Sequence, residues 1–488
     1  MLAALTCSLA CLCAGALSLS AAELRQGPGV PALEFATAEL GKSLFHFKGP
    51  VVKGKQLSAG PHNLLAMCKG WLLIVNSGSE TGRITFWDLG NPRAPTIAAT
   101  GNSPGPLSET HTLAMARHEG RDILALLGGN GIEFLDITDI NAITRISRVA
   151  LPLPGGDYEG RTWWLTWQGH TMYVGAGKTG MFIVDTRDLS KPAMVGTGPL
   201  LPTKFGLQAI GPVHAQGNLL VITGFAGSPL SMLDIADPHA PRTIGTLGKA
   251  SGYSATLHGD WFFGPHGIKR DAPKNRDRTV LDPLISLADP RKPVAVATIP
   301  NLGEGGYAIF DDRHLFIGNS TRMTIADIGD PAKPVVRQDW DLAHLGVDPK
   351  CDADFASPIG HLVALGSDHG DGGYLVPWTE KPDCTPPTVV AQRPRRGEAT
   401  VPITGRITIS FSSPIDFRSA DTVRLREPGG GEVRVRHICE LGALHLSPEA
   451  PLKPGTTYTV EVPAGSVKDH AGNAIAQAYT ASFSTVAK

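Results

Sequence analysis

Six side chains capable of acid–base, metal-binding or anion-binding chemistry stand at matching places in successive repeated segments of the chain. They are His62, His111, Arg161, Tyr253, Tyr307 and Asp354, with Thr162 and Asp352 as alternatives at two of the places. Two histidines and an aspartate suit a divalent metal ion, and an arginine and tyrosines can orient an anionic or sugar-like ligand. Histidines at strand starts are also ordinary hydrogen-bonding residues. These residues therefore make a site only if the fold brings them together.

Three other motifs look like catalytic or ligand-binding loops, but each lacks something that the chemistry needs. Gly101–Gly105 spells GxSxG, yet Pro104 follows the serine and has no N–H for an oxyanion hole. Gly175–Gly180 spells GxGxxG, but a strand-like segment follows where a phosphate-binding helix is required. Asp271–Asp282 has EF-hand-like oxygens, but Arg276 occupies the place of the obligatory glycine. We interpret these three segments as turns and loops.

The elements that would position the six residues are apolar, β-branched segments that recur about every 48 residues. The seven copies are residues 84–88, 132–136, 181–185, 230–234, 282–286, 323–327 and 374–377. Five of them end in a residue that we call a landmark aspartate: Asp88, Asp136, Asp185, Asp234 and Asp327. A carboxylate before a turn accepts backbone N–H groups, so we predict that these aspartates are structural rather than a catalytic ring.

Each copy is preceded by a second apolar run, and glycine-rich turns such as Gly128–Gly131 separate the two. Glycine and asparagine take the positive φ angles of tight hairpins, and the Asn/Asp-Pro sequences after several copies end a strand. Short strands with turns every 8–12 residues, and no amphipathic helix, indicate an all-β protein. Four strands in each repeat suit the blade of a propeller, whose innermost strands all start at one mouth of a central channel. The six residues would then converge at that mouth.

The copy Met181–Asp185, of sequence MFIVD, resembles the signature of the LVIVD-repeat propeller family. The resemblance covers about residues 60–378 and implies a seven-bladed β-propeller, to which we assign residues 23–378. The fifth copy departs from the pattern at Ser286 and carries an insertion at Lys269–Arg278, and the seventh departs at Pro377. We expect residues 31–57 to close the ring by adding a strand to the last blade.

A proline-rich linker at residues 379–387 leads to about 100 residues, 388–488, with period-two strands typical of a β-sandwich. The segments Phe411–Asp416, Leu452–Tyr458 and Val467–Asn473 make this region similar to the SbsA-type bacterial Ig-like domains. The resemblance implies a spacer or adhesion module of an exported protein. Asp469 and Asn473 supply too few oxygens for calcium, so we predict a side-chain-capped turn there.

Residues 1–22 are apolar or small and end in Ser20-Ala21-Ala22, which predicts a cleaved signal peptide and export to the periplasm, cell surface or medium. No basic residue precedes the apolar stretch, and lipidation or a buried helix are the alternatives. The 44 basic and 45 acidic residues nearly balance, which argues against nucleic acid as a partner. No internal stretch is apolar enough to span a membrane, so we expect no span in the mature chain.

Signal cleavage would leave Cys68, Cys351, Cys384 and Cys439. Cys351 and Cys384 bracket one repeat, and we predict a disulfide between them; free, buried thiols are the alternative.

The sequence supports two hypotheses about function. In the first, an exported, non-enzymatic protein without a cofactor binds a protein or polysaccharide of the envelope or extracellular space through its propeller face, and the Ig-like domain acts as a spacer. In the second, the channel mouth is the active site of a metal-assisted hydrolase or lyase. His62, His111 and Asp354 would ligate the metal there, and Tyr253 or Tyr307 would act as acid or base.

Overall fold

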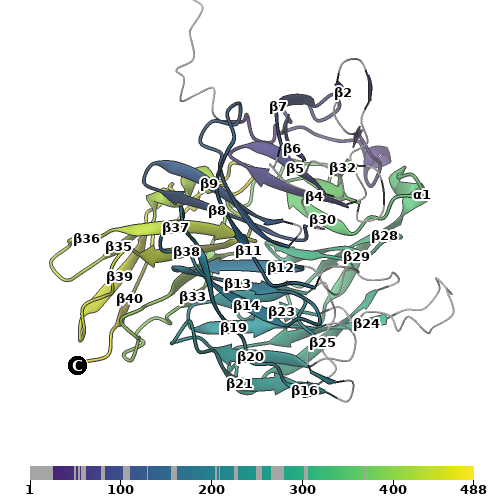
Figure 1. The fold of residues 1–488 in the computed structure, drawn as a ribbon. Helices are drawn as coiled ribbons and strands as arrows, with labels where there is room; N and C mark the ends of the chain where they lie inside the picture. Colours follow the sequence, from purple (N-terminus) through teal and green to yellow (C-terminus); the bar gives the residue numbers. More distant parts are fainter. Residues whose placement is uncertain are drawn as a thin grey trace, which may run out of the picture.

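The computed structural model describes residues 26–48, 51–52, 55–56, 62–77, 83–102, 110–128, 130–154, 162–203, 206–207, 209–224, 229–248, 255–264, 280–301, 306–367, 370 and 372–487. These residues are built almost entirely from β-strands, which form a propeller and, toward the C-terminus, an Ig-like domain (Figure 1). The predicted signal peptide and the insertion at Lys269–Arg278 lie outside the described residues.

Four-stranded antiparallel sheets succeed one another along the propeller, as the repeats predict. The first three comprise β4 (His62–Cys68), β5 (Trp71–Ser77), β6 (Arg83–Asp88) and β7 (Thr96–Asn102); β8 (Leu113–His118), β9 (Arg121–Gly128), β10 (Gly131–Asp136) and β11 (Thr144–Ala150); and β12 (Trp164–Gln168), β13 (Thr171–Gly175), β14 (Met181–Asp185) and β15 (Ala193–Thr197). The next three comprise β18 (Val213–Gln216), β19 (Leu219–Ile222), β20 (Leu230–Asp234) and β21 (Arg242–Leu247); β22 (Thr256–His258), β23 (Trp261–Phe263), β24 (Val280–Ser286) and β25 (Val294–Asn301); and β26 (Ala308–Asp311), β27 (His314–Gly318), β28 (Arg322–Asp327) and β29 (Val335–Asp341).

The last propeller sheet joins the two ends of the repeat region. Its strands β30 (Phe355–Ile359), β31 (Leu362–Gly366) and β32 (Gly373–Pro377) are completed by β1 (Phe45–Phe47), which pairs antiparallel with β32. The expected ring-closing strand from the N-terminal segment is therefore confirmed. A strand contributed from the far end of the chain closes the ring without a covalent link.

Contacts between neighbouring sheets run around the whole ring. The innermost strands β8 and β12, β12 and β18, β22 and β26, and β26 and β30 pack against each other, and β30 and β31 pack against β4. The two remaining junctions are made by the His214 ring, which hydrogen-bonds the Ala255 carbonyl at 3.0 Å, and by Lys69, whose ammonium donates to the Ile137 carbonyl at 3.0 Å. This closed arrangement is a β-propeller, in which radial packing protects the sheet edges.

The landmark aspartates stabilise turns, as predicted. In each case Oδ1 accepts the backbone N–H two residues later, at 2.7 Å for Asp88, 2.9 Å for Asp136, Asp185 and Asp234, and 3.0 Å for Asp327. A second turn of the same kind follows three residues on, at Asn91, Asp139, Asp188, Asp237 and Asp330. In these five sheets, two successive side-chain-capped turns therefore connect the third strand to the fourth. This arrangement explains why acidic residues or asparagine recur at a fixed spacing.

The Ig-like domain contains β33 (Val389–Arg393), β34 (Ile407–Phe411), β37 (Val435–Glu440) and β38 (Ala443–Pro448) on one side, and β35 (Arg424–Arg426), β36 (Glu432–Val433), β39 (Thr457–Val462) and β40 (Tyr479–Ser484) on the other. Its Asp469–Asn473 turn is capped by side chains, because Asp469 Oδ1 accepts the Asn473 N–H at 2.9 Å. The predicted sandwich and the predicted capped turn are both present.

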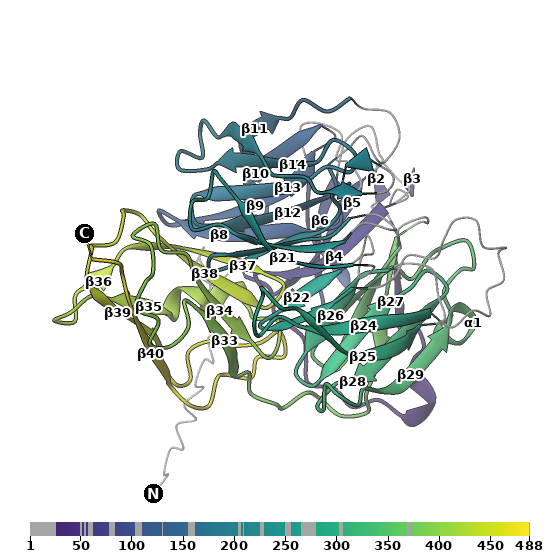
Figure 2. The ribbon, with the colours of Figure 1, turned by 90° about the horizontal axis from the view of Figure 1, so that it is seen from below.

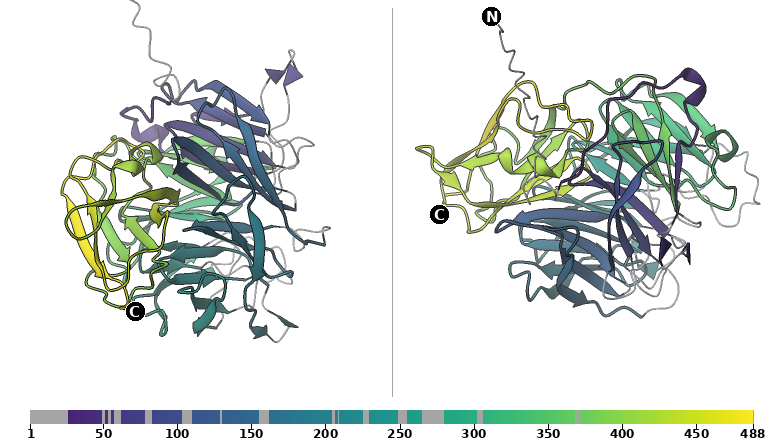
Figure 3. Two further views of the ribbon diagram at one scale, coloured as in Figure 1. Left: turned by 60° about the vertical axis from the view of Figure 1, so that its left-hand side comes forward. Right: turned by 90° about the horizontal axis from the view of Figure 1, so that it is seen from above.

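The domain does not stand apart as a spacer. Strand β37 pairs antiparallel with β8, with Cys439 opposite Met115, Ile438 opposite Ala116 and His437 opposite Arg117. The second propeller sheet and one sheet of the Ig-like domain consequently form a single eight-stranded sheet in the order β11-β10-β9-β8-β37-β38-β34-β33. Figure 2 shows β37 and β38 beside β8, and both views of Figure 3 show the yellow-green domain lying along one side of the propeller.

Other elements are short. They are the two-stranded pairs β2 (Val51–Val52) with β3 (Lys55–Gln56) and β16 (Pro202–Thr203) with β17 (Gly206–Leu207), the 3₁₀ turns η2 (Thr37–Glu39) and η4 (Phe417–Thr422), and the helix α1 (Leu342–Leu345). In the part of the chain that the structure describes, no helix combines the length and apolar character needed to cross a bilayer.

The continuous sheet predicts that the propeller and the Ig-like domain unfold together. We expect one calorimetric transition with equal calorimetric and van't Hoff enthalpies. Ile438→Pro should separate it into two transitions, because proline cannot donate to the hydrogen-bond ladder of a central strand and breaks the pairing that joins the domains. Glu432→Pro, in the edge strand β36, is the control and should retain one transition. Two transitions in the unmodified protein would contradict the prediction.

Candidate functional site

The structure brings three of the six candidate residues together at the propeller axis. His111, Tyr307 and Asp354 each lie just before an innermost strand, namely β8, β26 and β30. The ring centroids of His111 and Tyr307 are 5.0 Å apart and stacked. The Tyr307 N–H donates to the Asp354 carbonyl at 2.7 Å. Convergence follows from the ring, since the innermost strands of all sheets start at the same end.

These residues are packed rather than open to a channel. His111 is 2% exposed, and Tyr307 and Asp354 are each 4% exposed. His111 Nδ1 hydrogen-bonds the Trp163 carbonyl at 3.0 Å, and the two rings lie 4.2 Å apart. Tyr307 also stacks on Phe355, with centroids 4.3 Å apart and planes inclined by 5°, and the His111 and Phe355 centroids are 6.2 Å apart. An aromatic stack from three sheets therefore fills the axis at this level.

Asp354 serves the backbone of a neighbouring turn. Its Oδ1 accepts the Ser320 N–H at 2.7 Å and the Ser320 hydroxyl at 2.8 Å. Ser320 has a φ of 56°, a left-handed conformation that a serine adopts only when its surroundings hold it there. The carboxylate thus stabilises a strained turn between β27 and β28.

For the other three candidates the structure describes no side chain. Arg161 and Tyr253 lie in undescribed segments, and only the backbone of His62, at the start of β4, is described. Within the described ranges, no three His, Cys, Asp or Glu side chains lie close enough together to hold a metal ion. The metal set of His62, His111 and Asp354 stays a prediction.

The predicted disulfide is not formed in the structure. Cys351 is a buried free thiol, 3% exposed, and Cys384 is an exposed free thiol. Cys351 instead packs between α1 and the last propeller sheet, where the Tyr374 hydroxyl lies 3.8 Å from its sulfur. The bracketing positions in the sequence do not bring the two sulfurs together, because Cys384 belongs to the linker rather than to the packed repeat.

Toward the Ig-like domain, residues of that domain cover the end of the propeller axis. A cavity of about 90 Å³ lies between innermost strands of the propeller and loops of the Ig-like domain, and its lining is mostly apolar. The propeller contributes Leu64–Met67 and His111–Leu113, and the Ig-like domain contributes Pro414, Cys439–Gly442 and His470. On this side the residues at the axis are covered by the Ig-like domain.

Alternate residues of β37 face the propeller and make the polar contacts of the junction. Arg436, 1% exposed, donates to the Thr186 carbonyl at 3.0 Å, and its guanidinium lies 5.6 Å from the Trp167 ring centroid. Glu440 accepts the backbone N–H of Trp167 and, at 2.7 Å, the Thr166 hydroxyl. Burial raises the pKa of Glu440 to about 8, so this carboxyl is largely protonated at neutral pH.

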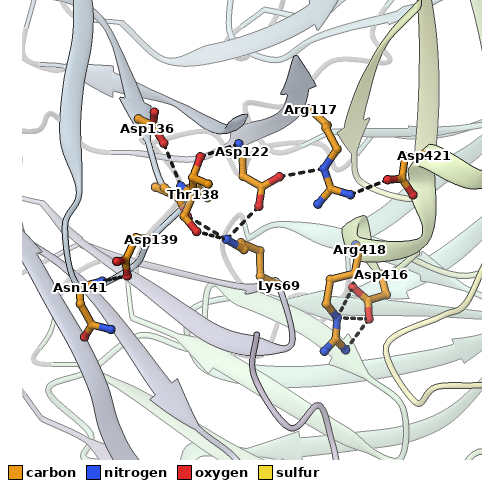
Figure 4. Close-up of polar contacts among 11 residues, drawn as sticks. Lys69, Arg117, Asp122, Asp136, Thr138, Asp139, Asn141, Asp416, Arg418 and Asp421 are labelled. Carbon is orange, nitrogen blue, oxygen red and sulfur yellow. Dashed lines mark hydrogen bonds and ion pairs between the residues drawn. The ribbon is translucent and has the colours of Figure 1, made fainter. Parts of the chain in front are cut away.

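Ion pairs link two propeller sheets to the Ig-like domain (Figure 4). Lys69 Nζ lies 2.8 Å from Asp122 Oδ2 and donates to the Thr138 carbonyl at 2.9 Å. Arg117 Nε donates to the other oxygen of Asp122 at 2.9 Å, and its NH1 reaches Asp421 of the Ig-like domain at 2.8 Å. The side chains of Lys69 and Asp122 are only 3% and 9% exposed. Each neutralises the buried charge of the other, which would be destabilising if it were left unpaired.

The comparison with known families concerns the C-terminal part of the chain. Residues 383–485 match the family model of the bacterial Ig-like domain. This region is a bacterial Ig-like domain. No curated protein matches the chain.

Several solved structures are similar at low sequence identity. The β-propeller domain of Swd1 from Myceliophteria thermophila is 15% identical over 63% of this chain and 94% of that one, with a TM-score of 0.45. A hypothetical selenium-binding protein from Sulfolobus tokodaii is 13% identical over 79% and 94% of the two chains, with a TM-score of 0.43. The periplasmic gluconolactonase of Pseudomonas aeruginosa is 12% identical over 60% and 88%, with a TM-score of 0.42. At these scores the similarities carry no functional argument.

The aromatic stack predicts a structural role for His111. His111→Ala should lower the free energy of unfolding by about 2–4 kcal/mol, because it leaves a cavity between packed rings and removes the partner of the Trp163 carbonyl. Urea unfolding measures the change. His239→Ala, at an exposed histidine, is the matched control and should change stability little. A His111→Ala protein as stable as the original would show that the ring is dispensable for packing.

The raised pKa of Glu440 predicts a pH-dependent junction. The ordinary glutamate pKa is 4.5, whereas the folded value is about 8, so the unfolded state loses the proton first as pH rises. The contribution of Glu440 to stability is full below pH 4.5 and is lost between about pH 4.5 and pH 8. The free energy of unfolding of Glu440→Gln should therefore fall less between pH 4.5 and pH 8 than that of the unmodified protein. At pH 8 this difference should favour the variant by a few kcal/mol. Parallel pH profiles of urea unfolding for the two proteins would contradict the prediction.

Proposed function

We propose that the chain is an exported, non-enzymatic binding protein of the bacterial envelope or surface. In this proposal a seven-bladed propeller with LVIVD-type repeats presents the binding face, and the Ig-like domain braces the propeller instead of acting as a free spacer. The partner is a protein or a polysaccharide of the envelope or extracellular space.

The observation that carries the proposal is the use of the axial residues in packing. His111 and Asp354, two of the three residues of the metal hypothesis, are buried and engaged by the Trp163 carbonyl and the Ser320 turn. Their geometry favours a rigid scaffold over an active site at that level of the axis. A binding protein needs such a scaffold, because loops held by a stiff framework lose little conformational entropy on binding.

Export is supported by the Ig-like domain, a type of module common on surface proteins, and by the signal-like residues 1–22. The junction described above also suits an extracellular protein. It joins the two domains through one continuous sheet, so that they form one body without a further subunit.

Export is tested by expressing the full chain in a Gram-negative bacterium, fractionating the cells and sequencing the N-terminus of the product. We expect an extracytoplasmic protein that begins at Glu23, because signal peptidase requires small residues before the cleavage site. Ala22→Glu should accumulate as the uncleaved precursor, whereas Gln26→Glu, beyond the cleavage site, should be processed normally. An uncleaved, cytoplasmic protein would overturn this part of the proposal.

Binding is tested with the purified mature protein on immobilised envelope protein and polysaccharide fractions. We expect retention by one fraction and unchanged retention after prolonged treatment with a chelator. Retention by no fraction, together with metal-dependent turnover of a small molecule that His111→Ala abolishes, would favour the hydrolase or lyase hypothesis instead.

A further inference from the structure

A cleft of about 370 Å³ lies where the propeller meets the Ig-like domain, away from the axis. The propeller contributes Gly169–Thr171, between β12 and β13, and Asp237–His239, after β20. The Ig-like domain contributes Ile403–Arg406, before β34, and Ser447–Pro451, at the end of β38. The volume is in the range of small-molecule sites, which lie preferentially at domain junctions.

Arg406 brings to this cleft a positive charge that forms no ion pair among the described residues. Its side chain is 4% exposed, and it donates to the Gln168 carbonyl and the Thr171 hydroxyl, each at 3.1 Å. Both acceptors are neutral, and Nε of Arg406 is buried without a hydrogen-bond partner. Among the described residues no carboxylate lies within ion-pair distance of this guanidinium. A buried cation of this kind is costly unless an anion completes its coordination.

The other charges of the cleft are already engaged. Arg187 forms an ion pair with Asp185 at 2.5 Å, and Glu449 lies 3.3 Å from Arg434. Asp237 uses one oxygen to accept the His239 N–H at 3.0 Å and keeps further acceptor capacity. Arg406 is thus a cation of the cleft lining without an ion-pair partner among the described residues, and the carboxylate of Asp237 acts on it only from beyond ion-pair distance.

Two more lining residues carry buried polar atoms without hydrogen-bond partners. These atoms are Nδ1 of His170 and Oγ of Ser447. His170 Nε2 lies 3.0 Å from the Pro448 carbonyl, an acceptor, so Nε2 carries the proton of the neutral ring. Nδ1 is then an acceptor that needs a donor. Burial and the nearby Arg436 lower the pKa of His170, which keeps the ring neutral.

We propose that this cleft binds a sugar acid, with the carboxylate directed to Arg406 and hydroxyls directed to His170, Ser447 and Asp237. A carboxylate supplies the charge that Arg406 lacks. Hydroxyl groups can donate to His170 Nδ1 and Asp237 and pair with the Ser447 hydroxyl, whereas propionate and sulfate have no donor for these acceptors. The site is separate from the propeller face of the proposed function, so it can exist whether or not that function is correct.

The test measures binding of D-glucuronate and D-galacturonate to the purified mature chain by titration calorimetry and thermal shift. We expect either sugar acid to raise the melting temperature and to bind at least about tenfold more tightly than glucose, propionate or sulfate. Glucose lacks the carboxylate and propionate lacks the hydroxyls, so each removes one half of the proposed recognition.

Arg406→Met should weaken sugar-acid binding by about tenfold or more, because it removes a charge-assisted contact while keeping the apolar stem. Arg393→Met is the control. Arg393 is a largely buried arginine of the Ig-like domain that also donates to a propeller carbonyl, that of Leu287, but it does not line the cleft, so affinity should be unchanged. If either variant fails to fold, Ala450→Trp on the exposed rim should abolish binding, and Ala464→Trp, exposed elsewhere on the domain, should not.

The proposal is overturned if neither sugar acid binds at millimolar concentration, or if Ala450→Trp binds as tightly as the original. It is equally overturned if propionate or sulfate binds as well as the sugar acids, because the cleft would then hold only an adventitious anion.

Discussion

The pairing of β37 with β8 is the interaction on which the rest of the structure depends. The innermost strand of a propeller sheet presents an unpaired edge toward the axis, and here a strand of the Ig-like domain occupies part of that edge. The hydrogen-bonded register fixes which side of β37 faces the propeller. Arg436, Ile438 and Glu440 are consequently inserted between the domains, and the ion pairs from Lys69 to Asp421 follow from the same placement.

This arrangement gives the two regions of the axis different roles. Where the innermost strands start, rings of His111, Tyr307 and Phe355 pack against each other, and farther along the Ig-like domain covers a small apolar cavity. Three lining residues of the cleft at the periphery of the junction, Arg406, His170 and Ser447, carry buried polar atoms without hydrogen-bond partners. A docked domain creates a cleft at its margin, because two convex surfaces that meet along one strand pair diverge on either side of it. The candidate ligand site is therefore a consequence of how the domains join.

Part of the axial cluster could be predicted and part could not. The repeat period places His111, Tyr307 and Asp354 before innermost strands, and any closed ring brings such positions together. Their burial could not be predicted, because Trp163 and Phe355, which cover them, come from neighbouring sheets. The Cys351–Cys384 pairing failed for a similar reason: distance along the chain says nothing about which segments pack inside the last sheet and which run over its surface.

The sequence by itself determined the strands and the capped turns, because these depend on local interactions and on alternation within a few residues. The ring-closing segment followed from the expected propeller topology, since its partner strand lies at the far end of the repeats. A landmark aspartate accepts a backbone N–H from two residues later, so its role can be predicted from the adjacent sequence. Only the tertiary structure decided that the Arg436–Glu440 face of β37 is buried. Alternation alone would assign the face with Arg436 and Glu440 to solvent. In the structure Arg436 instead donates to the backbone carbonyl of Thr186, 250 residues earlier in the chain. Contacts at such separation are set by how domains dock, which no local pattern encodes.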